Sequence, residues 1–163
     1  MQRNASRHRR APGDFHALMG ELLRHMQITP SAKAEPEVYA FTFDGRIEVR
    51  ILSRQPGTLD IVAPSLGKLR DGESQAVLRK LLEQNRYTPD RPCMSLGVDP
   101  ASGKMYLWAR HPLDSMDLES LVGLLHDILE RTDAIHACLE GKPAAHGVAA
   151  PGSRRPLHLR LHS

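Results

Sequence analysis

The chain has 163 residues, of which 40% are hydrophobic and 25% charged, an ordinary composition for one globular domain. No apolar run approaches the ~20 residues that a membrane-spanning helix needs, and no apolar segment follows the basic N-terminus. We therefore expect neither a membrane span nor a secretory signal. Cys93 and Cys138 form no close pair or framework, which favours a reducing, cytoplasmic location.

Charge is segregated along the chain. Residues 13–141 contain all 19 acidic residues and 14 Lys/Arg, a net charge of −5. The flanking segments contain 8 Lys/Arg and no acidic residue, a net charge of +8. The C-terminal flank is also rich in Pro and Gly. We therefore expect basic disordered tails at 1–12 and 142–163 around one folded domain at 13–141.

The first half of the domain predicts one helix and three strands. Apolar residues at helical spacing predict a helix from Phe15 to Met26, with Asp14 as its N-cap. Alternating residues predict two strands on either side of Asp44-Gly45, which is a strong hairpin signal. A third strand follows the turn at 56–57. The three strands are Tyr39–Phe43, Ile47–Ile51 and Leu59–Val62.

The second half predicts a helix, a second hairpin and a long helix. The first of these helices begins at Asp71 or Ser74, and the last begins near Asp114 or Asp117. Two strands flank a turn at 99–104 between the helices, namely Met94–Val98 and Met105–Arg110. The order α-β-β-β-α-β-β-α predicts an α+β fold, with helices packed on a twisted antiparallel sheet.

This order of elements resembles the class I chaperones of bacterial type III secretion, the Tir chaperone (CesT) family. The resemblance covers about residues 14–140. Leu81-Leu82-Glu83-Gln84-Asn85 resembles the "LLxxN" ending of the family's second helix, and 41–45 resembles its first hairpin. The second hairpin and the leucine-rich last helix also match. The resemblance implies a secretion-chaperone-like fold, a homodimer, no enzymatic activity, and neither cofactor nor metal.

The resemblance also implies partners and sites. Family members hold the N-terminal segment of a secreted effector in an export-competent state in the cytoplasm, and the secretion ATPase or sorting platform is a further candidate partner. We expect effector contact from Phe15, Leu22, Met26, Phe43, Ile47, Val49 and Ile51. We expect the dimer interface at Leu78, Leu81, Met94, Leu96, Leu107 and Trp108. The alternative for each residue is ordinary packing in the core.

Other function classes have weaker support in the sequence. Basic clusters at 3–10 and 154–155 offer an alternative, a nucleic-acid-binding or regulatory module that acts through the tails. The acidic domain, which has no aromatic stacking platform, argues against nucleic acid. The S-x-x-K pattern at 65–68 lacks the companion motifs of its enzyme class. His158 and His162 have helical spacing but no neighbouring metal ligand.

Overall fold

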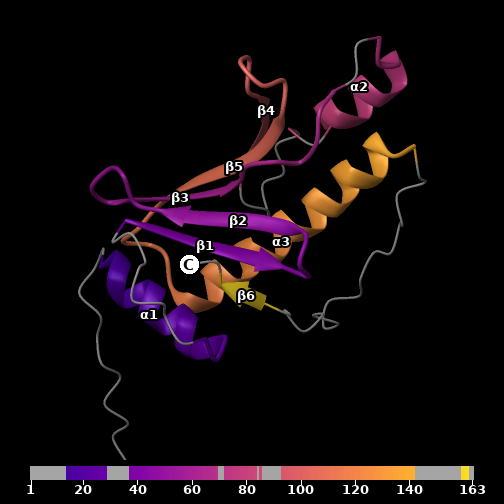
Figure 1. Ribbon diagram of the computed structural model, residues 1–163. Coiled ribbons are helices and arrows are strands. Elements are labelled where there is room, and N and C mark those ends of the chain that lie inside the picture. Colours follow the sequence, from indigo (N-terminus) through magenta and orange to yellow (C-terminus); the bar gives the residue numbers. More distant parts are fainter. Residues whose placement is uncertain are drawn as a thin grey trace, which may run out of the picture.

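The computed structural model describes residues 14–28, 37–69, 72–83, 85, 93–141 and 159–161. Its elements follow the predicted order and add one strand near the C-terminus (Figure 1). The helices are α1 (Phe15–His25), α2 (Gln75–Glu83) and α3 (Leu118–Leu139). The strands are β1 (Val38–Phe43), β2 (Ile47–Leu52), β3 (Thr58–Ala63), β4 (Met94–Val98), β5 (Met105–Pro112) and β6 (Leu159–Leu161).

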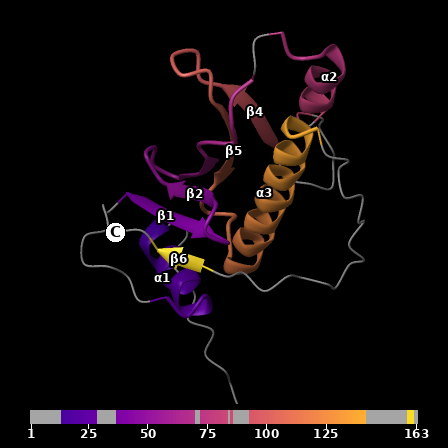
Figure 2. The same ribbon diagram turned by 45° about the vertical axis from the view of Figure 1, so that its right-hand side comes forward.

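The strands form a single antiparallel sheet in the order β4-β5-β3-β2-β1-β6. Helix α3 runs beside the sheet, and the other two helices contact it near opposite ends (Figure 1). Helix α1 lies near β1, whereas α2 lies near the C-terminal end of α3 (Figure 2). The layered α+β architecture that we predicted is confirmed.

The core lies between one face of the sheet and the helices. Along β2, Ile47, Val49 and Ile51 are buried, while Glu48 is partly exposed and Arg50 is exposed. This alternation is expected for a strand with one face on the core and the other toward water. Helices α1 and α3 supply the opposing apolar side chains, among them Leu18, Met19, Leu22, Leu121, Leu125 and Ile128.

Side-chain caps set the beginnings of the three helices. Asp14, Ser74 and Asp117 each accept a hydrogen bond from the backbone N–H three residues later, at 2.9, 3.3 and 2.8 Å. Such bonds satisfy N–H groups that have no partner within the first helical turn. The structure therefore selects Ser74 and Asp117 from the predicted pairs of start sites. Helix α1 ends at His25, one residue before the predicted end.

The first hairpin has the turn that Asp-Gly predicts. Asp44 and Gly45 have φ angles of 51° and 68°, both in the left-handed region that this kind of tight turn requires. The Arg46 N–H donates to the Phe43 carbonyl at 3.0 Å and closes the turn. The Arg46 guanidinium also pairs with Asp133 of α3 at 2.6 Å. The hairpin is therefore tied to the helix layer.

The C-terminal segment departs from the sequence prediction at three residues. We expected disorder throughout 142–163, but Leu159–Leu161 form β6 and pair with β1. Leucines alternate with polar residues there, a strand pattern that the surrounding Pro, Gly and Arg residues hid. The rest of this segment, with His158 and His162, lies outside the described residues, as does the predicted tail at 1–12.

Candidate partner-binding surfaces

One edge of the sheet, β4, is capped at its central residue, Leu96, by a side chain. The Asn85 Oδ1 atom accepts from the Leu96 N–H at 2.5 Å, and its Nδ2 group donates to the Leu96 carbonyl at 3.4 Å. The amide thus pairs with the backbone of Leu96 as a neighbouring strand would. Sequence reasoning identified Asn85 as the end of a motif but did not find this role, because the partner lies on another element.

The opposite edge, β1, is partly covered by β6. The three residues Leu159–Leu161 pair antiparallel with Phe41–Phe43 and reach only half of the six-residue β1 (Figures 1 and 2). Unpaired backbone N–H and C=O groups at a sheet edge attract another extended chain. Among the described residues, the Val38–Ala40 part of this edge has no paired strand and is therefore a candidate surface for an added strand.

The outward face of the sheet contains an aromatic and ionic cluster on β5. Arg110 donates two hydrogen bonds to Asp60 on β3, at 2.6 and 3.0 Å. Its guanidinium carbon lies 5.8 Å from the ring centroid of Trp108, within cation–π range. The ring of Tyr106 lies over Gly97 so closely that a Cβ atom there would come within 2.5 Å of it. These contacts fix the two aromatic rings on the outward face.

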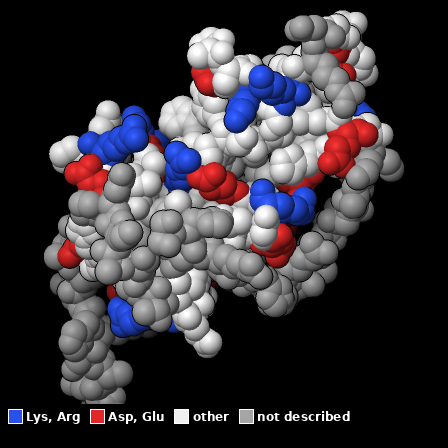
Figure 3. Space-filling model, in the orientation of Figure 1, with Lys and Arg blue, Asp and Glu red and all other residues white. Residues whose placement is uncertain are grey.

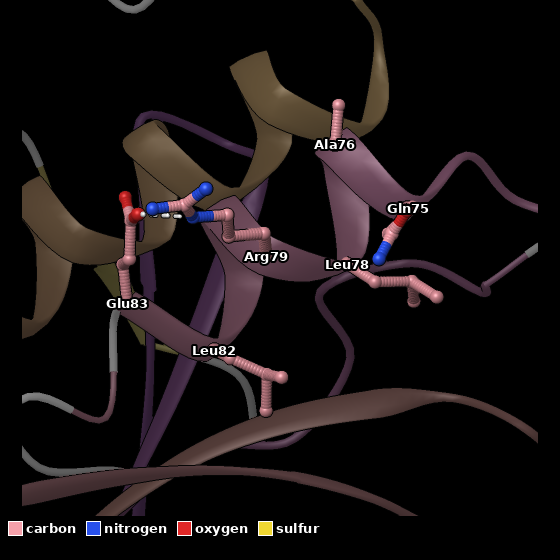
Figure 4. A pocket seen from close by; sticks show the side chains of 6 residues that line it. All are labelled: Gln75, Ala76, Leu78, Arg79, Leu82 and Glu83. Atoms are coloured by element: carbon pink, nitrogen blue, oxygen red, sulfur yellow. Dashed lines mark ion pairs between the residues drawn. The ribbon is translucent and has the colours of Figure 1, made fainter.

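Helix α2 has apolar residues on two sides. Leu81 is buried and Val77 packs against the core, with the Val77 carbonyl accepting a long contact from the Cys138 thiol at 3.9 Å. Leu78 and Leu82 are 39% and 69% exposed. They project from the same side of the helix, away from the Arg79–Glu83 ion pair (Figure 4). A helix that is apolar on two sides has a face left for a second partner.

The exposed side of α2 borders a hollow of about 880 Å³. Its described lining consists of Gln75, Ala76, Leu78, Arg79, Leu82 and Glu83. Sequence reasoning placed Leu82 on the helix but did not assign it to an interface. Leu82 lies four residues after Leu78, and Val77 and Leu81 form a second pair with the same spacing. Two such apolar pairs on one helix could have indicated a second apolar face.

The residues that we expected to contact an effector are mostly core residues in this structure. Phe15, Leu22, Phe43, Ile47, Val49 and Ile51 are at most 7% exposed. Met26 is partly exposed at the end of α1. The packing alternative therefore describes six of the seven residues in the free chain. Effector contact by the set stays a prediction, and Met26 is its most accessible member.

The expected dimer residues divide in the same way. Leu81, Met94 and Leu107 are buried at 4% exposure or less. Leu96 and Trp108 are partly exposed, and Leu78 is exposed. The three accessible residues lie on α2 and on the β4–β5 hairpin. A dimer interface at these elements stays a prediction.

Three titratable groups among the described residues have a shifted pKa. The hydrogen bonds to Asp60, together with the charge of that carboxylate, raise the pKa of Arg110. Burial lowers the pKa of His111, whose Nε2 atom is enclosed without a hydrogen-bond partner among the described residues. The pKa of Asp99 is lowered by the Ser102 hydroxyl and by the Ala101 N–H, which both donate to its carboxylate. Asp99 lies in the β4–β5 turn, so its bonds stabilise that turn.

The described residues provide no obvious centre for metal chemistry. Among them, no group of three or more His, Cys, Asp or Glu side chains is placed to hold a metal ion. Nor does any helix among them have the length and apolar character to cross a membrane. Basic and acidic side chains are interspersed on the face shown in Figure 3, without one broad basic patch. That face offers little to a nucleic-acid backbone.

Comparison with solved structures identifies the fold. In the complex of ExoU and SpcU from the type III secretion system of Pseudomonas aeruginosa, one chain has a TM-score of 0.62 and 20% identity; the match covers 75% of this chain and 98% of that one. A chain in the complex of the Yersinia pestis type III secretion chaperone SycH with a YscM2 fragment has a TM-score of 0.58 and 19% identity, over 71% and 94% of the two chains. A chain of the HopA1–SchA chaperone–effector complex has a TM-score of 0.60 and 15% identity, over 75% and 92%.

The sequence itself decides the family. No curated protein matches the chain significantly. The model of the Tir chaperone protein (CesT) family, however, matches residues 17–134, which extend from α1 into α3 and make up most of the chain. This range reaches from the first to the last of the helices that we predicted from sequence. The chain therefore belongs to the Tir chaperone (CesT) family.

Proposed function

We propose that this chain is a cytoplasmic type III secretion chaperone, which binds the N-terminal segment of a secreted effector and keeps it export-competent. The observation that carries the proposal is the family match over residues 17–134. Solved structures with the same fold include a chaperone–effector complex. The proposal assigns the function to the domain at 13–141 and treats the basic segments around it as accessory.

The proposed activity requires surface and needs no catalytic group. A partly unfolded client needs strand edges for its backbone and apolar surface for its side chains. The described surface has both, at the edge of β1 and at the partly exposed Met26 at the end of α1. Nothing in this mechanism calls for a cofactor. Contact with a secretion ATPase or sorting platform would use the same kind of surface.

The proposal includes a homodimer built on α2 and the β4–β5 hairpin. Leu78 and Leu82 present exposed apolar surface. On the hairpin, Leu96 lies partly exposed on the face that packs against the core, and Trp108 lies partly exposed on the outward face. Stable dimers bury roughly 1,200–2,000 Å² and favour aromatic residues near the centre of the contact. Two copies related by a two-fold axis would cover the same apolar patch on each.

Co-purification tests the effector assignment. The tagged chain, expressed in its own host, is expected to retain a secreted protein that mass spectrometry identifies. The first ~100 residues of that protein, an estimate of a segment long enough to wrap a large surface, should then bind the chain in co-expression. The remainder of the same protein is the matched control and should not bind. Failure to retain any secreted protein would contradict the proposal.

A salt titration separates this function from the nucleic-acid alternative. Phosphate contacts through the basic tails would weaken by orders of magnitude between about 50 and 200 mM salt. Deletion of 1–12 and 142–163 would abolish them. We expect effector binding to survive both changes. Nucleic-acid binding that meets both conditions, with no effector bound, would favour the alternative.

A further inference from the structure

The two edges of the sheet are closed in different ways. At β4, the amide side chain of Asn85 pairs with Leu96. Asn85 follows directly after α2, and Leu96 is only 11 residues further along the chain. At β1, the cover is β6, a strand that begins at Leu159, far along the chain from its partner residues Phe41–Phe43. A long connection makes closure entropically more costly than a short one. The β1 edge is therefore the easier one to open.

The pairing of β6 is also short. Its three residues face Phe41–Phe43, so the described residues show no strand against Val38–Ala40 on that side. Each ladder bond adds only about 0.5–1.5 kcal/mol of net stability, and a three-residue strand makes few of them. A longer extended segment could pair with all of β1 and gain more backbone hydrogen bonds than β6 does.

The sequence of β6 has the alternation of an edge-binding peptide. Leucines occur at 157, 159 and 161, and His158 and Arg160 separate them. The register sets Leu161 opposite Phe41 and Leu159 opposite Phe43, the two aromatic core residues of β1. Arg160 is opposite Thr42, which is itself opposite Glu48 on β2. An added strand is recognised by such alternation, through backbone pairing and every second side chain.

From this placement we infer that β6 is a built-in competitor: it occupies the β1 edge in the free chain, and an extended effector segment with alternating apolar residues displaces it. The inference rests on the proposed function. While β6 is paired, the effector cannot use the edge. The apparent Kd of the effector is therefore its intrinsic Kd divided by the fraction of time for which the edge is open. In the free chain, β6 also covers an edge that would otherwise pair with other chains.

Hydrogen exchange on the full chain tests whether β6 closes the edge, without any effector. Proline at 160 removes a backbone donor and disfavours the strand, so Arg160→Pro should release β6. Arg155→Pro is the matched control, because it introduces the same residue and removes the same charge outside β6. Amides of Phe41–Phe43, the residues paired with β6, should exchange faster in Arg160→Pro alone. Unchanged exchange in this variant would overturn the inference.

Affinity for the effector tests competition. The probe is the N-terminal fragment of about 100 residues from the co-purified effector, the length estimated above for a segment that wraps a large surface. If β6 closes the edge nine-tenths of the time, Arg160→Pro should lower the apparent Kd about tenfold, while Arg155→Pro leaves it unchanged. Faster exchange with an unchanged or weaker Kd would show that β6 is a permanent cover, and would overturn the competitor role.

A reversible lock provides the reverse experiment. Thr42→Cys and Arg160→Cys place two thiols at directly paired positions, in a background with Cys93→Ser and Cys138→Ser. Oxidation should weaken fragment binding at least about tenfold, and reduction should restore it. Equal binding in both redox states would contradict competition. The two proposals can fail separately. If β6 can be released and locked as expected but no effector is found, the proposed function is wrong, and the inference that β6 covers the β1 edge reversibly is retained.

Discussion

At the scale of single residues, the pairing of Asp60 with Arg110 stabilises the outward face of the sheet. The Asp60 side chain is 8% exposed, although it lies on the face away from the helices, whereas that of Arg110 is 45% exposed. The two donors of Arg110 cover both carboxylate oxygens, in the bidentate geometry typical of strong ion pairs. The guanidinium of Arg110 also lies near Trp108.

Removal of the Arg110 charge should therefore be costly. Arg110→Met keeps an aliphatic side chain but leaves the Asp60 carboxylate enclosed without its partner, and we expect the free energy of unfolding to fall by more than in the exposed control below. Urea unfolding monitored by circular dichroism would measure the change. Arg50→Met is the matched control on β2. Both side chains of its ion pair with Glu48 are exposed, so the pair should contribute at most about 1 kcal/mol to the free energy of unfolding. Equal losses in the two variants would show that enclosure of Asp60 is unimportant.

At the scale of elements, Asn85 connects the end of α2 to the edge of β4. The position of α2 is set on one side by Val77 and Leu81 against the core, and the amide pairing with Leu96 holds the chain that leaves the helix. A side chain that imitates a strand satisfies the edge without offering a surface for addition. The motif at 81–85 thus has a structural reason in this chain.

Substitution of Asn85 should loosen the β4 edge. Asn85→Ala loses both hydrogen bonds to Leu96, and we expect the free energy of unfolding to fall by about 1–2 kcal/mol. Asn85→Asp keeps the acceptor for the Leu96 N–H but loses the donor to its carbonyl, so its loss should be intermediate. Urea unfolding measures both losses, and faster hydrogen exchange in Met94–Val98 would locate them. Full stability in Asn85→Ala would refute the edge role.

At the scale of the whole molecule, the exposed leucines of α2 bear on assembly. Their apolar surface lies at one end of the molecule, beside a hollow and far along α3 from α1 (Figures 1 and 4). The β1 edge lies at the other side of the sheet, four strands away from β4. A dimer formed through α2 would therefore leave the β1 edge accessible, so assembly and strand addition would use separate surfaces.

A charge at Leu82 should break such a dimer without unfolding the chain. In a two-fold interface, Leu82→Arg introduces one charge from each copy. Loss of one buried leucine from each copy should also cost roughly 3–6 kcal/mol of dimerisation free energy in total. We expect the dimer dissociation constant to rise at least 100-fold, measured by light scattering over a dilution series. The circular dichroism spectrum should not change, because Leu82 is 69% exposed. Lys80→Gln is the charge-change control, and a Leu82→Arg protein that remains dimeric at micromolar concentration would place the interface elsewhere.

Local patterns accounted for most of the fold. The Asp44-Gly45 turn and the helical spacing of Leu18 and Leu22 are properties of neighbouring residues, so both were predictable. Burial was harder to predict. The apolar residues between Phe15 and Ile51 that we expected to contact an effector mostly pack in the core between α1 and the sheet. An apolar pattern shows that a face is covered but does not identify what covers it.

The sequence by itself determined the element order, the acidic character of the domain and the family, because periodicity, turn residues and motif spacing are local. Only the tertiary structure decided which side of α2 is free, what Asn85 pairs with and where Leu159–Leu161 lie. These depend on contacts between residues distant in the chain, where the entropy of loop closure and the geometry of packing select one partner among many. For the same reason, the sequence did not predict that β6 pairs with β1, because the segment around β6 has the composition of a basic tail.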